Sequence, residues 1–279
     1  MKQKIELSVE FFPPQTPEGV EKLRAVRQRL AALNPDFYSV TFGAGGTTRE
    51  RTFDIAKEIK AEGTRVAPHL SCIGSTSAKI REILEDYRSA GIRDVVALRG
   101  DLPSGTAEAG EFRHAAELVE FIRRETGDHF HIRVAAYPEW HPQARHPRDD
   151  LSGFVKKVGA GADSAITQYF YNADAYFNLV DDAHRLGVEI PIVPGVMPIN
   201  SFSKLARFSD NCGAELPRWM RRKFEELSDD TDAIRDFGLD LVTRLCERLL
   251  AGGAPGLHFF SMNQSALTLE ICSRLNLSA

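Results

Sequence analysis

The stretch IELSVEFFPP, residues 5–14, alternates apolar and polar side chains and then stops on two prolines. In an extended segment, one face would carry the apolar members of this stretch, Ile5, Leu7, Val9 and Phe11. Proline cannot continue a hydrogen-bonded ladder, so the strand is expected to end before Pro13. Glu10 is then the last polar residue on the opposite face, at the carboxyl end of the first strand.

Similar apolar runs recur along the chain, and a helical pattern follows each one. The eight strand-like runs are residues 5–12, 36–43, 65–72, 93–100, 131–138, 163–170, 190–197 and 256–263. This alternation also suits a doubly wound sheet, but eight units in about 250 residues is the size of a (β/α)8 TIM barrel. Residues 201–252 are predicted to be extra helices before the eighth strand. The whole chain, residues 1–279, is therefore expected to be one α/β catalytic barrel domain.

Composition narrows the range of functions. The net charge is −4, from 35 basic and 39 acidic residues, so no nucleic-acid partner is expected. The chain has no apolar run of about 18 residues that would span a membrane. Its amino terminus, MKQKIELS, lacks the apolar region of a signal peptide, so a cytoplasmic protein is expected. The four cysteines lie far apart and are predicted to be free buried thiols, neither a zinc site nor disulfides: Cys72, Cys212, Cys246 and Cys272.

Active sites of (β/α)8 barrels lie at the carboxyl ends of the strands. The predicted strands end in polar or ionisable groups, namely Glu10, Thr41, His69, Arg99-Gly100-Asp101, Tyr137-Pro138-Glu139 and Gln168-Tyr169. Side chains alternate between the two faces of a strand, so Arg99 and Asp101 fall on the same face as Ala97. In the same way Tyr137 shares the face of Ala135, and Gln168 shares the face of Ile166. We therefore expect these side chains to point into the barrel and to form one site.

Several kinds of chemistry lack their motifs at this rim. No H-E-x-x-H occurs, and His129 and His131 stand at the start of a strand, so no metal site is predicted. Nucleophile elbows and Schiff-base lysines at strand ends are also missing. The glycine run at residues 43–46 suits either phosphate binding or a plain tight turn. The remaining groups suit a large, flat, phosphate-bearing organic ligand.

Motifs spread over nearly the whole chain resemble, in order and spacing, methylenetetrahydrofolate reductases of the bacterial, catalytic-domain-only kind. They are EFFPP, VTFGAGG, APHLSCIG, VALRGDLP, AAYPEWHP, GADSAITQYFY, PIVPGVMPI and LHFFSMNQ. The resemblance implies flavin adenine dinucleotide (FAD) bound across the rim and a homo-oligomer. NADH or NADPH would reduce the flavin and leave, and 5,10-methylenetetrahydrofolate would then be reduced to 5-methyltetrahydrofolate in the same place. Such a sequence of events is a ping-pong scheme.

The resemblance implies that two carboxylates are catalytic. Glu10 matches the general acid, which would need a pKa above the ordinary value of about 4.3 to hold a proton near neutral pH. Phe11 and Phe12 are expected to raise that pKa by desolvation. Asp101 matches the aspartate between flavin and pterin, where it would hydrogen-bond the pterin and bias the flavin's electronics. A simple pair with Arg99 is the alternative.

The remaining site residues also follow from the resemblance. Flavin contacts are implied for Phe42, Ala44, His69, Arg99, Gly100, Asp101, Ala115, Tyr137, His141, Asp150, Lys156 and Lys157, with the lysines facing the pyrophosphate. Thr41 matches a nicotinamide contact and Gln168 a contact to both substrates. Lys204 and Phe208 match folate contacts, although Phe208 also suits a helix core. Gln264 stands in the folate site where some relatives have arginine, and Gly153 where some have asparagine.

Three other readings compete with this one. A proline-dehydrogenase-like barrel would use a similar cofactor but has no evident use for a protonating Glu10. A metal-dependent hydrolase needs ligands that the sequence does not show. A flavin- or folate-binding module without turnover would not need both Glu10 and Asp101.

Overall fold

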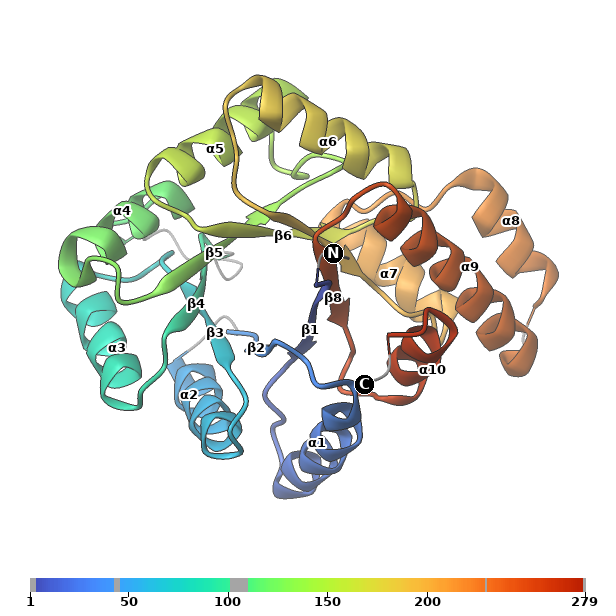
Figure 1. Ribbon diagram of the computed structural model, residues 1–279, viewed down its shortest axis with the longest axis horizontal. Coiled ribbons are helices and arrows are strands. Elements are labelled where there is room, and N and C mark those ends of the chain that lie inside the picture. Colours follow the sequence, from blue (N-terminus) through green and yellow to red (C-terminus); the bar gives the residue numbers. More distant parts are fainter. Residues whose placement is uncertain (1–3, 43–45, 101–109, 229, 278–279) are drawn as a thin grey trace.

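The computed structural model describes residues 4–42, 46–100, 110–228 and 230–277. Eight parallel strands follow one another in chain order and close into a barrel, because the last strand pairs with the first. Helices surround this barrel (Figure 1). The strands are β1 (Glu6–Phe11), β2 (Phe37–Val40), β3 (Val66–Ser71), β4 (Asp94–Leu98), β5 (His131–Ala136), β6 (Ser164–Tyr169), β7 (Ile192–Val196) and β8 (Gly256–Phe260). The predicted TIM barrel is confirmed.

The helices include the predicted extra set between β7 and β8. The series is α1 (Pro17–Leu30), a short 3-10 helix η1 (Ala31–Leu33), α2 (Gly46–Ala61), α3 (Ser77–Ser89), α4 (Ala115–Thr126), α5 (Pro147–Gly159), α6 (Ala173–Arg185), α7 (Phe202–Cys212), α8 (Arg218–Glu226), α9 (Thr231–Ala251) and α10 (Ala266–Arg274). Helices α7, α8 and α9 are the insertion, and they lie together beside the barrel (Figure 1). Within the described segments, no helix has the length and apolar character that a membrane span requires.

Local side-chain chemistry sets several helix starts. The Thr16 hydroxyl accepts a hydrogen bond from the Gly19 N–H (3.1 Å), and Pro17 occupies the first turn of α1. Asp230 caps α9 in the same way by accepting from the Ala233 N–H at 3.0 Å. These caps satisfy N–H groups that have no partner inside the helix. These capping contacts define where α1 and α9 begin.

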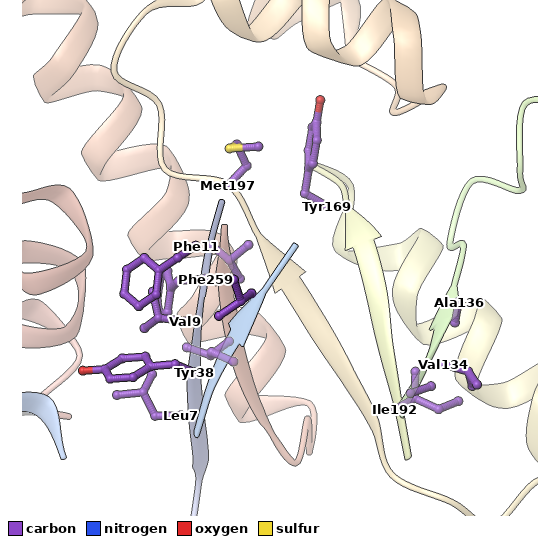
Figure 2. Close-up of a cluster of buried hydrophobic side chains, with 14 of the residues drawn as sticks. Leu7, Val9, Phe11, Tyr38, Val134, Ala136, Tyr169, Ile192, Met197 and Phe259 are labelled. Atoms are coloured by element: carbon purple, nitrogen blue, oxygen red, sulfur yellow. The ribbon is translucent and has the colours of Figure 1, made fainter. Parts of the chain in front are cut away.

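The strands present two different faces. Leu7, Val9 and Phe11 lie on one side of β1, where the rings of Phe11 and Tyr38 approach to 5.0 Å (Figure 2). These residues belong to the large core between strands and helices. A smaller cluster fills the inside of the barrel and consists of Phe37, Ala67, Val96 and Ile166, with Leu98 packed against it.

The structure corrects the parity assigned to Arg99. Ala97 belongs to the outer core, whereas its strand neighbours Val96 and Leu98 pack inside the barrel. Strand β4 ends at Leu98, so Arg99 already lies in the following loop. The alternation of side chains along β4 was counted correctly. The small side chain of Ala97, however, does not mark the inner face of this strand, because Ala97 faces the outer core.

A buried ion pair occupies the amino-terminal part of the barrel interior. Arg133 Nη1 donates to Asp94 Oδ1 at 2.6 Å, and both side chains are almost fully buried. Arg65 adds a second hydrogen bond to the same carboxylate at 2.5 Å. The Arg133 guanidinium lies 3.8 Å from the centre of the Phe37 ring. This end of the barrel is closed by structural contacts, so the candidate site lies at the other end.

Candidate active site at the carboxyl ends of the strands

Glu10 lies inside the barrel near the end of β1, between two imidazoles. Its Oε2 is 3.2 Å from His69 Nε2 on β3 and 3.7 Å from His258 Nε2 on β8. The Ser39 hydroxyl of β2 approaches the same oxygen at 3.5 Å. His258 Nδ1 forms a 2.8 Å hydrogen bond with Ser8 Oγ, two residues before Glu10 on the same strand face. Strands β1, β2, β3 and β8 thus contribute to one polar cluster.

These neighbours decide the ionisation of Glu10. Burial by itself would raise the pKa, but the charges and hydrogen bonds of His69 and His258 outweigh it and lower the pKa to about 2. The expectation that Phe11 and Phe12 would raise this pKa is therefore wrong. Phe11 is buried on the opposite face of β1, and Phe12 is 43% exposed, so imidazoles rather than phenyl rings govern the carboxylate.

His258 is a site residue that the sequence analysis missed. It is fully buried, and its Nε2, like that of His69, has no well-aligned hydrogen-bond partner among the described residues. The available signal was the same one that selected Glu10, a single polar residue within the apolar strand at residues 256–260. Buried imidazole nitrogens of this kind are free to share a proton with Glu10 or with a ligand.

Thr41 and Phe42 follow β2 directly and are half-buried at the rim. The Thr41 N–H donates to the Phe11 carbonyl at 2.8 Å, and the Thr52 hydroxyl donates to the Thr41 carbonyl at 2.9 Å. The end of β2 is therefore held between β1 and α2. Two predicted site residues, Ala44 and Asp101, lie outside the described residues.

The loop after β4 makes a close backbone approach at Gly100. This residue has φ of +82°, and a Cβ there would lie 1.8 Å from Ser71 Oγ. Only glycine fits such a position. The Arg99 carbonyl accepts a hydrogen bond from Ser71 Oγ at 2.9 Å, and its guanidinium donates to the side chain of Gln143. Arg99 therefore connects the loop after β4 with the loop after β5.

The loop after β5 gathers another group of predicted residues. The Tyr137 and His141 rings meet edge to face with their centres 4.7 Å apart. Burial raises the pKa of Asp150 on α5, while Lys157 and the His141 backbone N–H act in the opposite direction. Lys157 points inward, since its Nζ donates to the Ala135 carbonyl at 2.5 Å. Burial lowers the pKa of this ammonium to about 8, with Asp150 opposing.

The two predicted lysines therefore differ in environment. Lys156 is exposed, whereas Lys157 is half-buried against β5. Gly153 lies on the same helix, between Asp150 and the two lysines. A Cβ added to it would meet nothing within 4 Å. A larger side chain would therefore have space at this position. Ala115 is the first residue of α4, whose start is held by the Glu117 carboxylate through the N–H groups of Arg113 (2.7 Å) and His114 (3.3 Å).

The residues predicted to bind folate occupy three elements. Gln168 is half-buried on β6, and its side-chain oxygen accepts a hydrogen bond from the Tyr169 N–H at 3.0 Å. Lys204 and Phe208 lie four residues apart on α7, both exposed, with Phe208 at 42%. Phe208 is therefore not part of the helix core. Gln264 is exposed after β8, and the Asn200 side-chain amide donates to its oxygen.

The described structure brings these residues together in part. Glu10 and His69 share the interior cluster, and Tyr137 and His141 of the loop after β5 lie close to Asp150 and Lys157 of α5. Lys204 and Phe208 share one helix face. Ala115 begins α4 and Gln264 follows β8, so these two residues come from other elements. The result is a buried acid–imidazole centre with a rim of aromatic and charged side chains.

The family model and the sequence relatives agree on one family. The family model described as methylenetetrahydrofolate reductase matches residues 1–276. The chain is 39% identical over 274 residues to 5,10-methylenetetrahydrofolate reductase of Pectobacterium carotovorum subsp. carotovorum, covering 98% of this chain and 90% of that one. The Escherichia coli (strain K12) protein of the same name is 39% identical over 272 residues, with 97% and 90% covered.

A solved structure from Clostridium thermocellum shows the same fold. It is described as an uncharacterized protein that binds two copies of 5-methyl-5,6,7,8-tetrahydrofolic acid. The TM-score is 0.66 at 18% identity, and the match covers 99% of this chain and 95% of that one. At this level of identity the likeness supports the barrel architecture and no more.

Proposed function

The chain belongs to the methylenetetrahydrofolate reductase family, NAD(P)H-dependent oxidoreductases of folate one-carbon metabolism, and we propose that Glu10 is its general acid. The observation that carries the proposal is the Glu10 carboxylate held between His69 and His258 at the carboxyl end of the barrel. The methylene bridge of the folate must open to an iminium before it can accept a hydride. That opening requires a proton on the departing nitrogen, which a carboxylic acid can deliver.

The low pKa of Glu10 is compatible with this role. An ionised carboxylate beside a protonated imidazole contains the same proton as a neutral acid beside a neutral imidazole, so moving that proton to Glu10 makes it an acid. Oε2 makes the contacts to His69 and His258, and we assign Oε1 to the folate nitrogen. In the form with a neutral acid, Glu10 would give its proton to the nitrogen, which leaves a carboxylate beside neutral imidazoles.

We propose FAD as the flavin. When bound, it accepts a hydride from NADH or NADPH and passes that hydride to the folate in a ping-pong sequence. The match to the reductase family over residues 1–276 supports this choice. The proposed contacts are Phe42, Ala44, His69, Arg99, Gly100, Asp101, Ala115, Tyr137, His141, Asp150, Lys156 and Lys157. Exposed Lys156 suits a phosphate better than the inward-turned Lys157 does.

The substrates are assigned partly to further residues of the rim. Phe208 exposes its ring for stacking on the folate, and Lys204, one turn away, offers a charge for a carboxylate. Gln168 would contact both substrates, Thr41 the nicotinamide, and Asp101 the pterin. The Gln264 oxygen is occupied by Asn200, which leaves the amide NH2 to donate to folate. A neutral donor of this kind is weaker than the arginine of some relatives.

Three broader assignments accompany this function. We propose that residues 1–279 form one catalytic domain, that the protein works in the cytoplasm, and that it forms a homo-oligomer. The closed barrel supports the first assignment. The resemblance to the bacterial reductases supports the other two.

The decisive experiment replaces Glu10 by glutamine, which keeps the size of the side chain but removes the transferable proton. The folate half-reaction, followed by stopped flow from reduced flavin, should slow by about 10²–10⁴-fold. Flavin reduction by NADH should stay nearly unchanged, since it needs no protonated leaving group. Glu6→Gln, at the other end of β1, is the matched control and should slow neither step.

Other outcomes would contradict the assignment. Equal slowing of both half-reactions would mean that Glu10 positions the flavin, and no slowing would make it structural. Steady-state reciprocal plots for wild type should be parallel. Intersecting lines would rule out the ping-pong sequence.

A further inference from the structure

Helix α7, which carries Lys204 and Phe208, is attached to the barrel by polar contacts of its second half. The Ser209 hydroxyl lies 3.0 Å from the Tyr169 hydroxyl at the end of β6. The Cys212 thiol contacts the same tyrosine oxygen at 3.3 Å. These contacts connect the second half of α7 to the strand that carries Gln168.

A further contact reaches the chain just after α7. The Glu139 carboxylate, in the loop after β5, accepts a hydrogen bond from the Glu215 backbone N–H at 2.7 Å. In the same region, a Cβ at Gly213 would lie 3.1 Å from Pro142, so the two segments pack tightly. A side chain from one loop therefore holds the exit of α7, 76 residues further along the chain.

Glu139 is an unusual side chain for a purely structural contact. Its Oε1 is buried and has no hydrogen-bond partner within the described part of the chain. Burial raises its pKa to about 7, and the charge of Glu215 adds to this while the Glu215 N–H opposes it. Glu139 borders a narrow crevice of only about 10 Å³ together with Gln168, Tyr169 and Cys212. An unsatisfied buried carboxylate destabilises a fold, so its presence beside Gln168 points to a role in the site.

We propose that Glu139 positions α7 at the barrel mouth and thereby sets the affinity for folate. The inference rests on the proposed function, in which Lys204 and Phe208 contact folate. Glu139 itself touches neither substrate and acts through the Glu215 N–H. Tyr137 and His141, which share its loop, are held by their mutual ring contact and by Asp150, so flavin binding should not depend on Glu139.

The test compares Glu139→Ala and Glu139→Gln in the full-length, flavin-loaded protein. Alanine removes the acceptor, whereas the glutamine oxygen can still accept from Glu215. Amide hydrogen exchange of residues 202–217 should become faster in Glu139→Ala and remain near wild type in Glu139→Gln. Exchange in α3, far from this contact in the chain, is the internal control. Glu139→Met, which keeps the chain length without the acceptor, replaces the alanine variant if that variant does not fold.

The kinetic readout separates folate binding from flavin chemistry. Loss of one charge-assisted hydrogen bond should raise the folate KM by about tenfold in Glu139→Ala. The rate of flavin reduction by NADH should not change, and Glu139→Gln should restore most of the folate affinity. This pattern would support positioning rather than general destabilisation.

Two results would overturn the proposal. Unchanged exchange in residues 202–217 would show that Glu139 does not hold α7. Faster exchange with an unchanged folate KM would also contradict it, and Phe208→Ala then identifies the error. If Phe208→Ala raises the KM, the link from Glu139 to folate is wrong; if it does not, the proposed folate contact on α7 is wrong.

Discussion

At the scale of single residues, one oxygen of Glu10 lies within 3.7 Å of two imidazole nitrogens from two other strands. The surrounding barrel interior is largely apolar, including Phe37 and Ile166. Charges and hydrogen bonds act more strongly in such an environment than in water. The three side chains should therefore behave as one proton-holding group rather than as a carboxylic acid with independent neighbours.

The first prediction at this scale concerns His258. His258→Asn can keep a polar contact to Ser8 but loses the nitrogen that faces Glu10. We expect the folate half-reaction to slow by about tenfold, corresponding to a change of about one pKa unit in the acid group. Flavin reduction should be unchanged in stopped flow. His131→Asn, a partly buried histidine at the start of β5, is the control, and equal slowing in it would contradict the assignment.

The same variant has a pH signature. Because the native pKa of Glu10 is lowered from 4.5 to about 2, its pairing stabilises the fold above the unfolded pKa. This stabilisation is lost as the pH falls through the native pKa. Denaturant unfolding should therefore show His258→Asn less stable than wild type at neutral pH, with the difference shrinking from about pH 5 toward about pH 2. A constant difference would show that the histidine acts by packing alone.

At the scale of elements, α5 combines two requirements. His146 caps it by accepting from the Arg148 N–H at 3.1 Å, and Pro147 occupies its first turn. Asp150 and Lys157, seven residues apart, lie on the same face toward the rim. Gly153 falls between them and leaves that part of the face without a side chain. The helix thus contributes binding residues and open space from one surface.

Gly153→Ala should stabilise the protein by about 0.5–1 kcal/mol, because alanine loses less backbone entropy in a helix than glycine. The new methyl group would meet nothing within 4 Å. Gly252→Ala is the matched contrast, since its Cβ would lie 2.3 Å from the Phe177 ring and should destabilise. Thermal unfolding of both variants checks the prediction. Destabilisation by Gly153→Ala would mean that the open space on α5 is required by the native packing.

At the scale of the whole molecule, the barrel separates stability from function along its axis. The buried pair of Arg133 and Asp94 fills the amino-terminal part of the interior, and the Glu10 cluster lies toward the carboxyl ends. The Arg133–Asp94 pair and the Glu10 cluster come from different positions along the strands. Apolar side chains also fill the interior. Residues at the first end should affect unfolding, and residues at the second should affect catalysis.

Arg133→Leu tests this separation. Removing one partner of a buried ion pair typically costs about 3–5 kcal/mol, and Arg65 should keep the loss at the lower end of that range. Denaturant unfolding measures the loss, while the half-reactions of the folded variant should match wild type. Arg185→Leu, which breaks an exposed pair with Asp182, should change the free energy of unfolding by less than about 1 kcal/mol. A catalytic defect in folded Arg133→Leu would contradict the separation.

Much of this protein follows from local patterns. Period-two alternation in residues 5–12 placed Glu10 on the face opposite Val9, and repetition of strand and helix predicted the closed barrel and its inserted helices. The polar residues after each strand indicated the end of the barrel where the site lies. These features depend on the order of neighbouring residues, which the sequence contains directly.

Only the tertiary structure decided what surrounds those residues. The pKa of Glu10 is lowered because His258, about 250 residues away along the chain, is brought beside it when β8 closes on β1. Closure also fixed which face of β4 is interior, turned Lys157 toward β5, and joined Glu139 to Glu215. Alternation determines the two sides of one strand, but electrostatic balance depends on side chains from several strands. Their register around the closed barrel sets those distances, and no local pattern encodes it.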